Sequence, residues 1–78
     1  MIQIIWPNGE LTTGKTFAEV ERAIRATQWQ TYATRRDFRE ELAARAKVWS
    51  GIIVPIRKSS EDFIRSLHKA NMFMMFVD

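Results

Sequence analysis

The longest stretch with clear helical character is residues 34–51, TRRDFREELAARAKVWSG, and the rest of the chain is organised around it. Thr34 can cap the start of a helix, and Asp37 stands three residues later at the capping-box position. Four apolar residues recur at three- and four-residue spacing and predict one buried stripe: Phe38, Leu42, Ala46 and Trp49. Gly51 suits the left-handed position that follows a helix end. We therefore predict a long amphipathic helix that packs against the rest of the chain.

A shorter helix is predicted before this stretch, beginning at Thr16, with Glu19 at the capping-box position. Its inward-facing residues are Phe17, Val20 and Ile24. Glu21 and Arg25 stand four residues apart, and we place this ion pair on the exposed side of the helix. The helical pattern weakens near Gln28, where the helix is expected to end.

A third helix is predicted to begin at Ser59, which has Asp62 at the capping-box position. Its inward-facing residues are Phe63, Ile64 and Leu67. We expect His68 to be a partly exposed helix residue, because a single histidine without a partner carries no mechanism. Asn71 is expected to stop the helix.

Strands are predicted around these helices. Residues 2–6 are apolar on both faces, which favours an interior strand. The turn Pro7-Asn8-Gly9 predicts a hairpin that returns through residues 10–13. Residues 52–56 form either a short edge strand or an extended crossing segment. Residues 72–77, MFMMFV, are apolar without alternation and predict a strand that is covered on both faces.

The predicted order of elements is β-β-α-α-β-α-β, which is typical of the α+β class. We expect a small mixed sheet of three to four strands with three helices that cover one face. The first and last strands are expected to form its central pair. The opening hairpin and helix resemble the start of the β-grasp (ubiquitin-like) fold. This resemblance is structural, covers about the first third of the chain, and ends where the long helix begins.

The composition limits the chemistry that the chain can perform. With 78 residues we expect one compact domain, residues 1–78, with a thin stability margin. There is no cysteine and one histidine, which excludes disulfides and zinc sites rich in cysteine or histidine. We therefore expect no metal and no cofactor. The sequence shows no signal peptide and no run of about 20 apolar residues, so we expect a cytoplasmic protein.

Residues 9–16, GELTTGKT, match the phosphate-loop pattern G-x-x-x-x-G-K-[ST] in full. In such a loop Gly14, Lys15 and Thr16 would contact nucleotide phosphates and magnesium. We interpret the match as a coincidence for two reasons. The remaining chain is too short for a doubly wound parallel sheet, and Pro7-Asn8-Gly9 favours a hairpin.

One flank of the predicted long helix is basic. Its cations are Arg35, Arg36, Arg39 and Lys47. Trp29 and Tyr32 lie just upstream, and arginine forks beside aromatic rings suit a phosphate backbone or an RNA loop. The alternative is a solvated helix face, because the net charge of +3 is modest and no nucleic-acid motif accompanies the strip.

No catalytic arrangement emerges, since no Ser or Thr has a positioned base, and we expect that the protein is not an enzyme. Residues 29–50, together with the hairpin WPNGE and the final helix SSEDFIRSLHKANMF, resemble small uncharacterised accessory proteins of actinobacterial phages. This resemblance implies a binding role in the cytoplasm of a bacterial host rather than a reaction.

Three hypotheses about function follow. The first is a protein-interaction module that binds itself, as a homodimer or larger homo-oligomer, or a host protein through Trp, Met or Arg anchors. The second is a nucleic-acid-binding protein that uses the basic strip of the long helix. The third is a nucleotide binder that uses Gly14, Lys15 and Thr16. A membrane partner is not expected.

Overall fold

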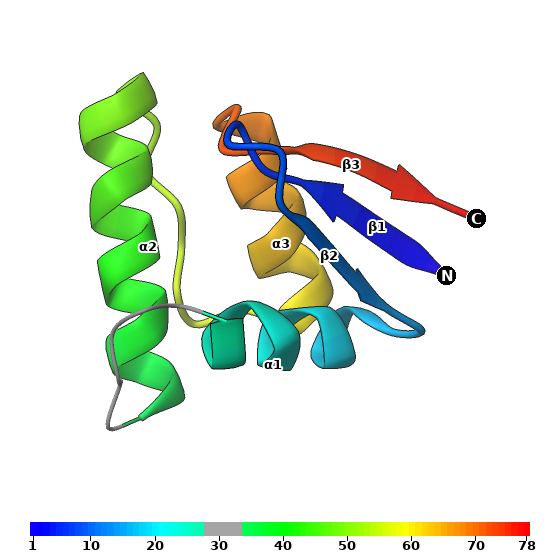
Figure 1. Cartoon of the computed structure of the whole chain (residues 1–78). Helices are drawn as coiled ribbons and strands as arrows, with labels where there is room; N and C mark the ends of the chain where they lie inside the picture. Colours follow the sequence, from blue (N-terminus) through cyan, green and yellow to red (C-terminus); the bar gives the residue numbers. More distant parts are fainter. Residues whose placement is uncertain (28–33) are drawn as a thin grey trace.

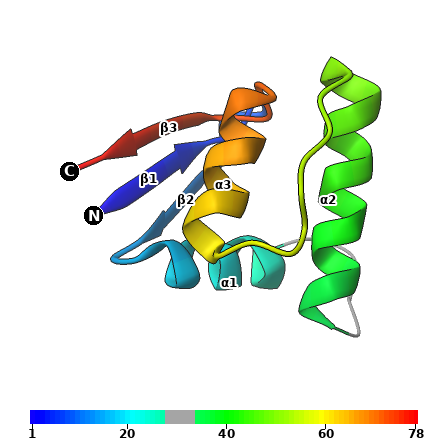
Figure 2. The same ribbon diagram turned by 180° about the vertical axis from the view of Figure 1, so that it is seen from behind.

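The computed structural model describes residues 1–27 and 34–78, and its elements confirm the predicted α+β class. The strands are β1 (Ile2–Ile5), β2 (Leu11–Gly14) and β3 (Met74–Val77), and the helices are α1 (Phe17–Thr27), α2 (Arg35–Ser50) and α3 (Ser60–Lys69). The strands form one sheet with α3 across one of its faces (Figures 1 and 2). Within the described ranges, no helix is long and apolar enough to cross a membrane.

The sheet has the order β2-β1-β3, and both strand pairs are antiparallel. β1 is central, as its two apolar faces predict. The predicted hairpin turn is also confirmed, with Gly9 at φ +88° and the N–H of Trp6 donating to the carbonyl oxygen of Glu10 at 2.9 Å. The sheet is antiparallel rather than mixed, because α3 returns the chain to the end of β1, where β3 begins (Figure 1).

For residues 52–56 the structure has the second of the two predicted alternatives, an extended crossing segment, because residues 52–54 are not paired in the sheet. They belong to the segment 51–59, which runs back beside α2 to the start of α3 and so lies away from the sheet (Figures 1 and 2). One strand prediction, that of β3, needs correction. β3 is an edge strand and is not covered on both faces, since Met74 is 57% exposed and Phe76 is 48% exposed. The helices cover one face of the sheet, and these two side chains lie on the other.

The predicted long helix is α2, and both of its ends are confirmed. Thr34 Oγ1 accepts the N–H of Asp37 at 3.1 Å, and Gly51 takes a left-handed φ of +76°. Three members of the predicted stripe are buried: Phe38, Leu42 and Ala46. The fourth, Trp49, is 72% exposed. The last turn of α2 extends beyond the elements against which the helix packs (Figure 1), so the apolar period continues after the core has ended.

The other two helices begin as predicted. Thr16 Oγ1 accepts the N–H of Glu19 at 3.1 Å, and Ser59 Oγ accepts the N–H of Asp62 at 3.2 Å. His68 is exposed, also as predicted. The buried apolar core draws on β1, all three helices and their connections: Ile2, Ile4, Val20, Ile24, Phe38, Leu42, Ala46, Val54, Phe63, Ile64, Leu67, Ala70 and Phe73.

Candidate functional site

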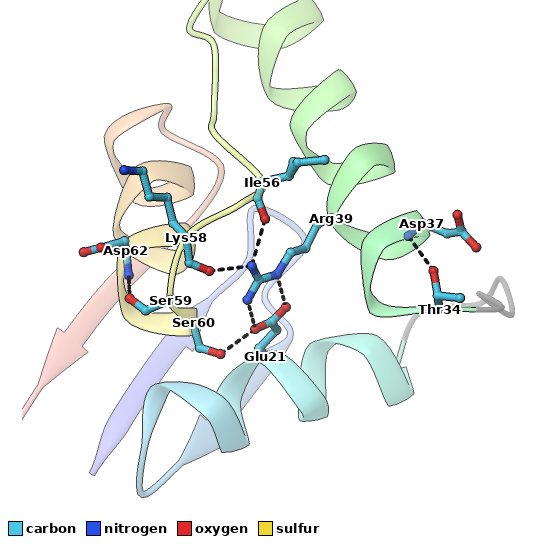
Figure 3. A network of polar contacts seen from close by, with 9 residues as sticks. All are labelled: Glu21, Thr34, Asp37, Arg39, Ile56, Lys58, Ser59, Ser60 and Asp62. Atoms are coloured by element: carbon cyan, nitrogen blue, oxygen red, sulfur yellow. Dashed lines mark hydrogen bonds and ion pairs between the residues drawn. The ribbon is translucent and has the colours of Figure 1, made fainter.

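A buried ion pair joins α1 to α2 (Figure 3). Glu21 is 3% exposed and Arg39 is 4% exposed. The contact is bidentate, because Arg39 Nε donates to Glu21 Oε2 at 2.6 Å and Arg39 Nη2 donates to Glu21 Oε1 at 2.8 Å. A two-bond fork of this kind fixes orientation as well as charge. The pair therefore sets how the first half of α2 lies against α1.

The same guanidinium holds the segment that leads into α3. Arg39 Nη1 donates to the carbonyl oxygen of Ile56 at 2.9 Å and to that of Lys58 at 2.6 Å. Arg39 Cζ also lies 4.8 Å from the centroid of the Phe63 ring, a cation–π distance. One side chain thus ties together α1, α2, residues 56–58 and α3 (Figure 3).

The Glu21 carboxylate is held ionised inside the protein. Burial raises the pKa of Glu21, but hydrogen bonds from Arg39 and Ser60 and the charges of Arg39 and Arg35 outweigh burial, so the pKa lies below its ordinary value of 4.5. Ser60 Oγ donates to Glu21 Oε1 at 2.6 Å. The hydrogen bond to Glu21 raises the pKa of Arg39. Both groups therefore stay charged at neutral pH, which is typical of a structural ion pair.

This geometry overturns the prediction that Glu21 lies on the exposed side of α1 with Arg25. The sequence nevertheless indicates that Glu21 and Arg39 are buried. Arg39 stands three residues before Leu42, and Glu21 stands three residues before Ile24, so both charges share a face with core residues. Opposite charges on two buried helix faces predict a buried ion pair.

Two adjoining hollows beside this ion pair form a basic cleft. One, of about 320 Å³, lies between the start of α2 and residues 56–58. The other, of about 230 Å³, lies between α1 and the start of α3, and Arg35 lines both. We define the basic cleft by the exposed and half-buried cations of the two hollows: Arg22, Arg25, Arg35, Arg36, Arg57 and Lys58.

The basic cleft contains only part of the predicted basic strip. Arg35 and Arg36 line it from the first turn of α2. Arg39 is buried against Glu21, so it adds no exposed cation, and Lys47 lies in the last turn of α2, away from the cleft. The predicted aromatic residues Trp29 and Tyr32 lie outside the described residues. The other cations of the cleft were not predicted, because they come from α1 and from residues 57–58, which are distant in the sequence.

An apolar groove of about 530 Å³ lies at the opposite end of α2. It is lined by Trp6, Pro7, Ala44, Arg45, Val48, Trp49 and Met72. On the α2 side, Val48 is 90% exposed and Trp49 is 72% exposed. The other side comes from the turn that follows β1 and from the connection between α3 and β3, which lie at the same end of the molecule as the end of α2 (Figure 1).

Hydrogen bonds and ring packing fix the wall of the apolar groove opposite α2. Trp6 Nε1 donates to Thr12 Oγ1 at 3.0 Å, and the Trp6 ring meets Phe73 edge-on with 5.1 Å between centroids. The N–H of Met72 donates to the carbonyl oxygen of Leu67 at 3.2 Å. The groove therefore has one pre-formed wall and one wall of exposed side chains.

The residues that match the phosphate-loop pattern form a strand and a helix cap. Gly14 ends β2, and a Cβ atom on it would lie 2.9 Å from the backbone N of Val20, so glycine permits close packing of β2 on α1. The N–H groups of Lys15 and Thr16 donate to Glu19 Oε2 at 2.7 and 3.2 Å. A carboxylate thus already occupies these donors, and residues 9–16 contain no loop that could surround a phosphate.

Among the described residues, no three His, Asp or Glu side chains gather closely enough to hold a metal ion. Comparison with models of protein families, with curated proteins and with solved structures finds no match to this chain. The resemblance to accessory proteins of actinobacterial phages therefore stays a prediction. The candidate functional sites are the two surfaces that α2 connects, the basic cleft and the apolar groove.

Proposed function

We propose that this chain is a non-enzymatic protein-interaction module that binds a second copy of itself through the apolar groove. The observation that carries the proposal is the exposed pair Val48 and Trp49 beside a groove of about 530 Å³. Large apolar side chains exposed together at a concave surface are typical of interaction sites. Tryptophan is also among the residue types most enriched as interface anchors.

A second copy suits the groove because the same surface carries both an anchor and a hollow. A twofold interface is self-complementary, so each copy must present both features in one patch. Trp49 of one protomer would enter the groove of the other protomer beside Trp6 and Met72, and the reciprocal contact would form at the same time. The charged residue of the lining, Arg45, already forms an ion pair with Glu41 at 3.3 Å. Docking of a second copy therefore buries no unpaired charge at this position.

The exposed apolar side chains at the groove supply part of the area that a stable dimer buries. At 72% exposure, Trp49 presents roughly 110–180 Å² of side chain. Burial of that area contributes about 3–4.5 kcal/mol per protomer at about 25 cal/mol per Å². Ile52 and Ile53, which follow the end of α2 in the sequence, are also exposed. A standard interface needs about 800 Å² per partner, which is about 15% of the accessible surface of 5216 Å².

Sedimentation equilibrium of the wild type and two variants tests the proposal. Trp49→Ser removes an anchor twice in a twofold dimer, at about 2 kcal/mol or more each, so the dimer dissociation constant should rise about 1000-fold. Phe76→Ser is the matched control, because it removes an exposed aromatic ring from the outer face of β3, and it should keep the wild-type constant. A wild type that stays monomeric at about 1 mM would contradict the proposal. So would a dimer that Phe76→Ser dissociates and Trp49→Ser leaves intact.

A further inference from the structure

The basic cleft concentrates the positive charge of the protein. Its two hollows are lined by seven of the twelve Lys and Arg residues and by one of the nine Asp and Glu residues, a local net charge of +6. Because the whole chain carries +3, the remaining residues carry −3 together. Clustered charge of one sign around a concave surface attracts ligands of the opposite sign. The cleft is therefore an anion-attracting surface on a protein that is otherwise slightly acidic.

The acidic groups near the cleft leave its exposed cations largely uncompensated. Glu21 is buried, and its oxygens accept hydrogen bonds from Arg39 and Ser60. Glu40 pairs with Arg36 at 3.0 Å, but both side chains are exposed, and pairs of this kind are screened and weak. Five cations of the cleft take part in no ion pair between described residues: Arg22, Arg25, Arg35, Arg57 and Lys58.

The buried ion pair pre-organises the cleft. Arg39 binds the carbonyl oxygens of Ile56 and Lys58 from the interior, which holds this segment beside the start of α2 (Figure 3). These two carbonyls point at the guanidinium and do not oppose an anion in the cleft. Helices α2 and α3 also begin at lining residues, Arg35 and Ser60, but acidic side chains in their first turns, Asp37, Glu61 and Asp62, offset the positive ends of the helix dipoles, so the cations supply the potential.

We propose that the basic cleft binds the phosphodiester backbone of a nucleic acid. Five of its six defining cations are arginines, whose forks match phosphate oxygens in bidentate fashion. None of the described lining residues is aromatic, so these residues recognise phosphates rather than bases, and binding through them should show no sequence preference. A membrane surface suits the cleft less well, because the lining is concave and its described residues offer no large exposed apolar side chain for insertion.

Fluorescence anisotropy of the full chain with labelled single-stranded DNA and RNA of mixed sequence tests the proposal. Four to six phosphate contacts predict that log K falls with log salt concentration with a slope of about −3 to −4 between about 50 and 300 mM salt. The variant Arg35→Glu with Arg57→Glu should bind about 100-fold more weakly, with a shallower slope. Should this variant fail to fold, Arg35→Gln with Arg57→Gln removes the same contacts without adding negative charge.

The matched control is Lys47→Glu with Lys69→Glu, which changes the net charge equally at two exposed positions away from the cleft. Its affinity should stay within about threefold of wild type if the cleft is the site. The proposal would be overturned by an equal loss in this control, by binding that ignores salt, or by no binding at about 50 mM salt. It would also be overturned if phosphatidylserine vesicles bound the chain and displaced the oligonucleotide. Because the cleft and the apolar groove lie at opposite ends of α2, this proposal does not rest on self-association.

Discussion

Replacement of Arg39 by methionine is expected to cost about 3–5 kcal/mol of folding free energy, as is usual when one partner of a buried ion pair is removed. The substitution leaves the Glu21 carboxylate buried, with Ser60 as its remaining hydrogen-bond donor among the described residues. It also deprives the carbonyl oxygens of Ile56 and Lys58 of the Arg39 donor. A chain of 78 residues has a total stability of about 4–12 kcal/mol. Urea denaturation at pH 7, followed by circular dichroism, should therefore show a large loss of stability.

The cost of Arg39→Met should also depend on pH. In the wild type the pKa of Glu21 is lowered, so its stabilising contribution is present above 4.5 and is lost as the pH falls through the lowered value. In Arg39→Met, burial without the arginine should raise the pKa of Glu21, so that protonation relieves the buried charge on acidification. The difference in stability between the two proteins should therefore shrink from pH 7 towards pH 4.

A double variant separates the ion pair from simple loss of packing. Glu21→Leu with Arg39→Met removes both charges, and such replacements are often neutral or less costly than removal of one partner. We expect the double variant to be more stable than Arg39→Met alone. A cost below about 1 kcal/mol for Arg39→Met, a pH-independent difference, or a double variant that is no more stable than the single one would refute this reasoning.

Three further changes test the remaining structure. Gly14→Ala should destabilise the protein by about 1–3 kcal/mol in urea denaturation, since the added Cβ meets the backbone of Val20 at 2.9 Å; an unchanged midpoint would contradict this packing role. Thr34→Ala should cost about 1 kcal/mol by loss of the cap to Asp37, with Thr34→Ser as the control that keeps it. Lys15→Ala should change stability by less than about 0.5 kcal/mol, and titration calorimetry should detect no ATP binding before or after the substitution.

Local signals in the sequence predicted most of the fold. The caps at Thr16, Thr34 and Ser59 fixed the starts of the helices, and the turn ending at Gly9 fixed the first hairpin. These features depend on neighbouring residues, so one sequence is enough to find them. The edge position of β3 depends on what lies beside it in space, and apolar composition alone suggested the opposite.

The candidate sites were less predictable, because they combine residues that are distant along the chain. The helical period placed Trp49 in the core, although α2 extends past the elements that cover it. The same period also puts Arg39 on the buried face of α2, but its partner Glu21 lies 18 residues earlier in the chain. The basic cleft is lined by residues from α1, from α2 and from the segment 56–58. The buried ion pair that holds these parts side by side was not predicted from the sequence.

The most direct test of self-association through the apolar groove uses the absence of cysteine from the chain. Val48→Cys places a single thiol at the rim of the groove, at a position that is 90% exposed, and Phe76→Cys places one on the outer face of β3. The rate of reaction with a maleimide is measured for each variant as protein concentration rises. We predict that the reaction at position 48 slows as the dimer forms, while the reaction at position 76 keeps its rate. A constant rate at position 48 in a solution where sedimentation detects dimers would contradict this interface.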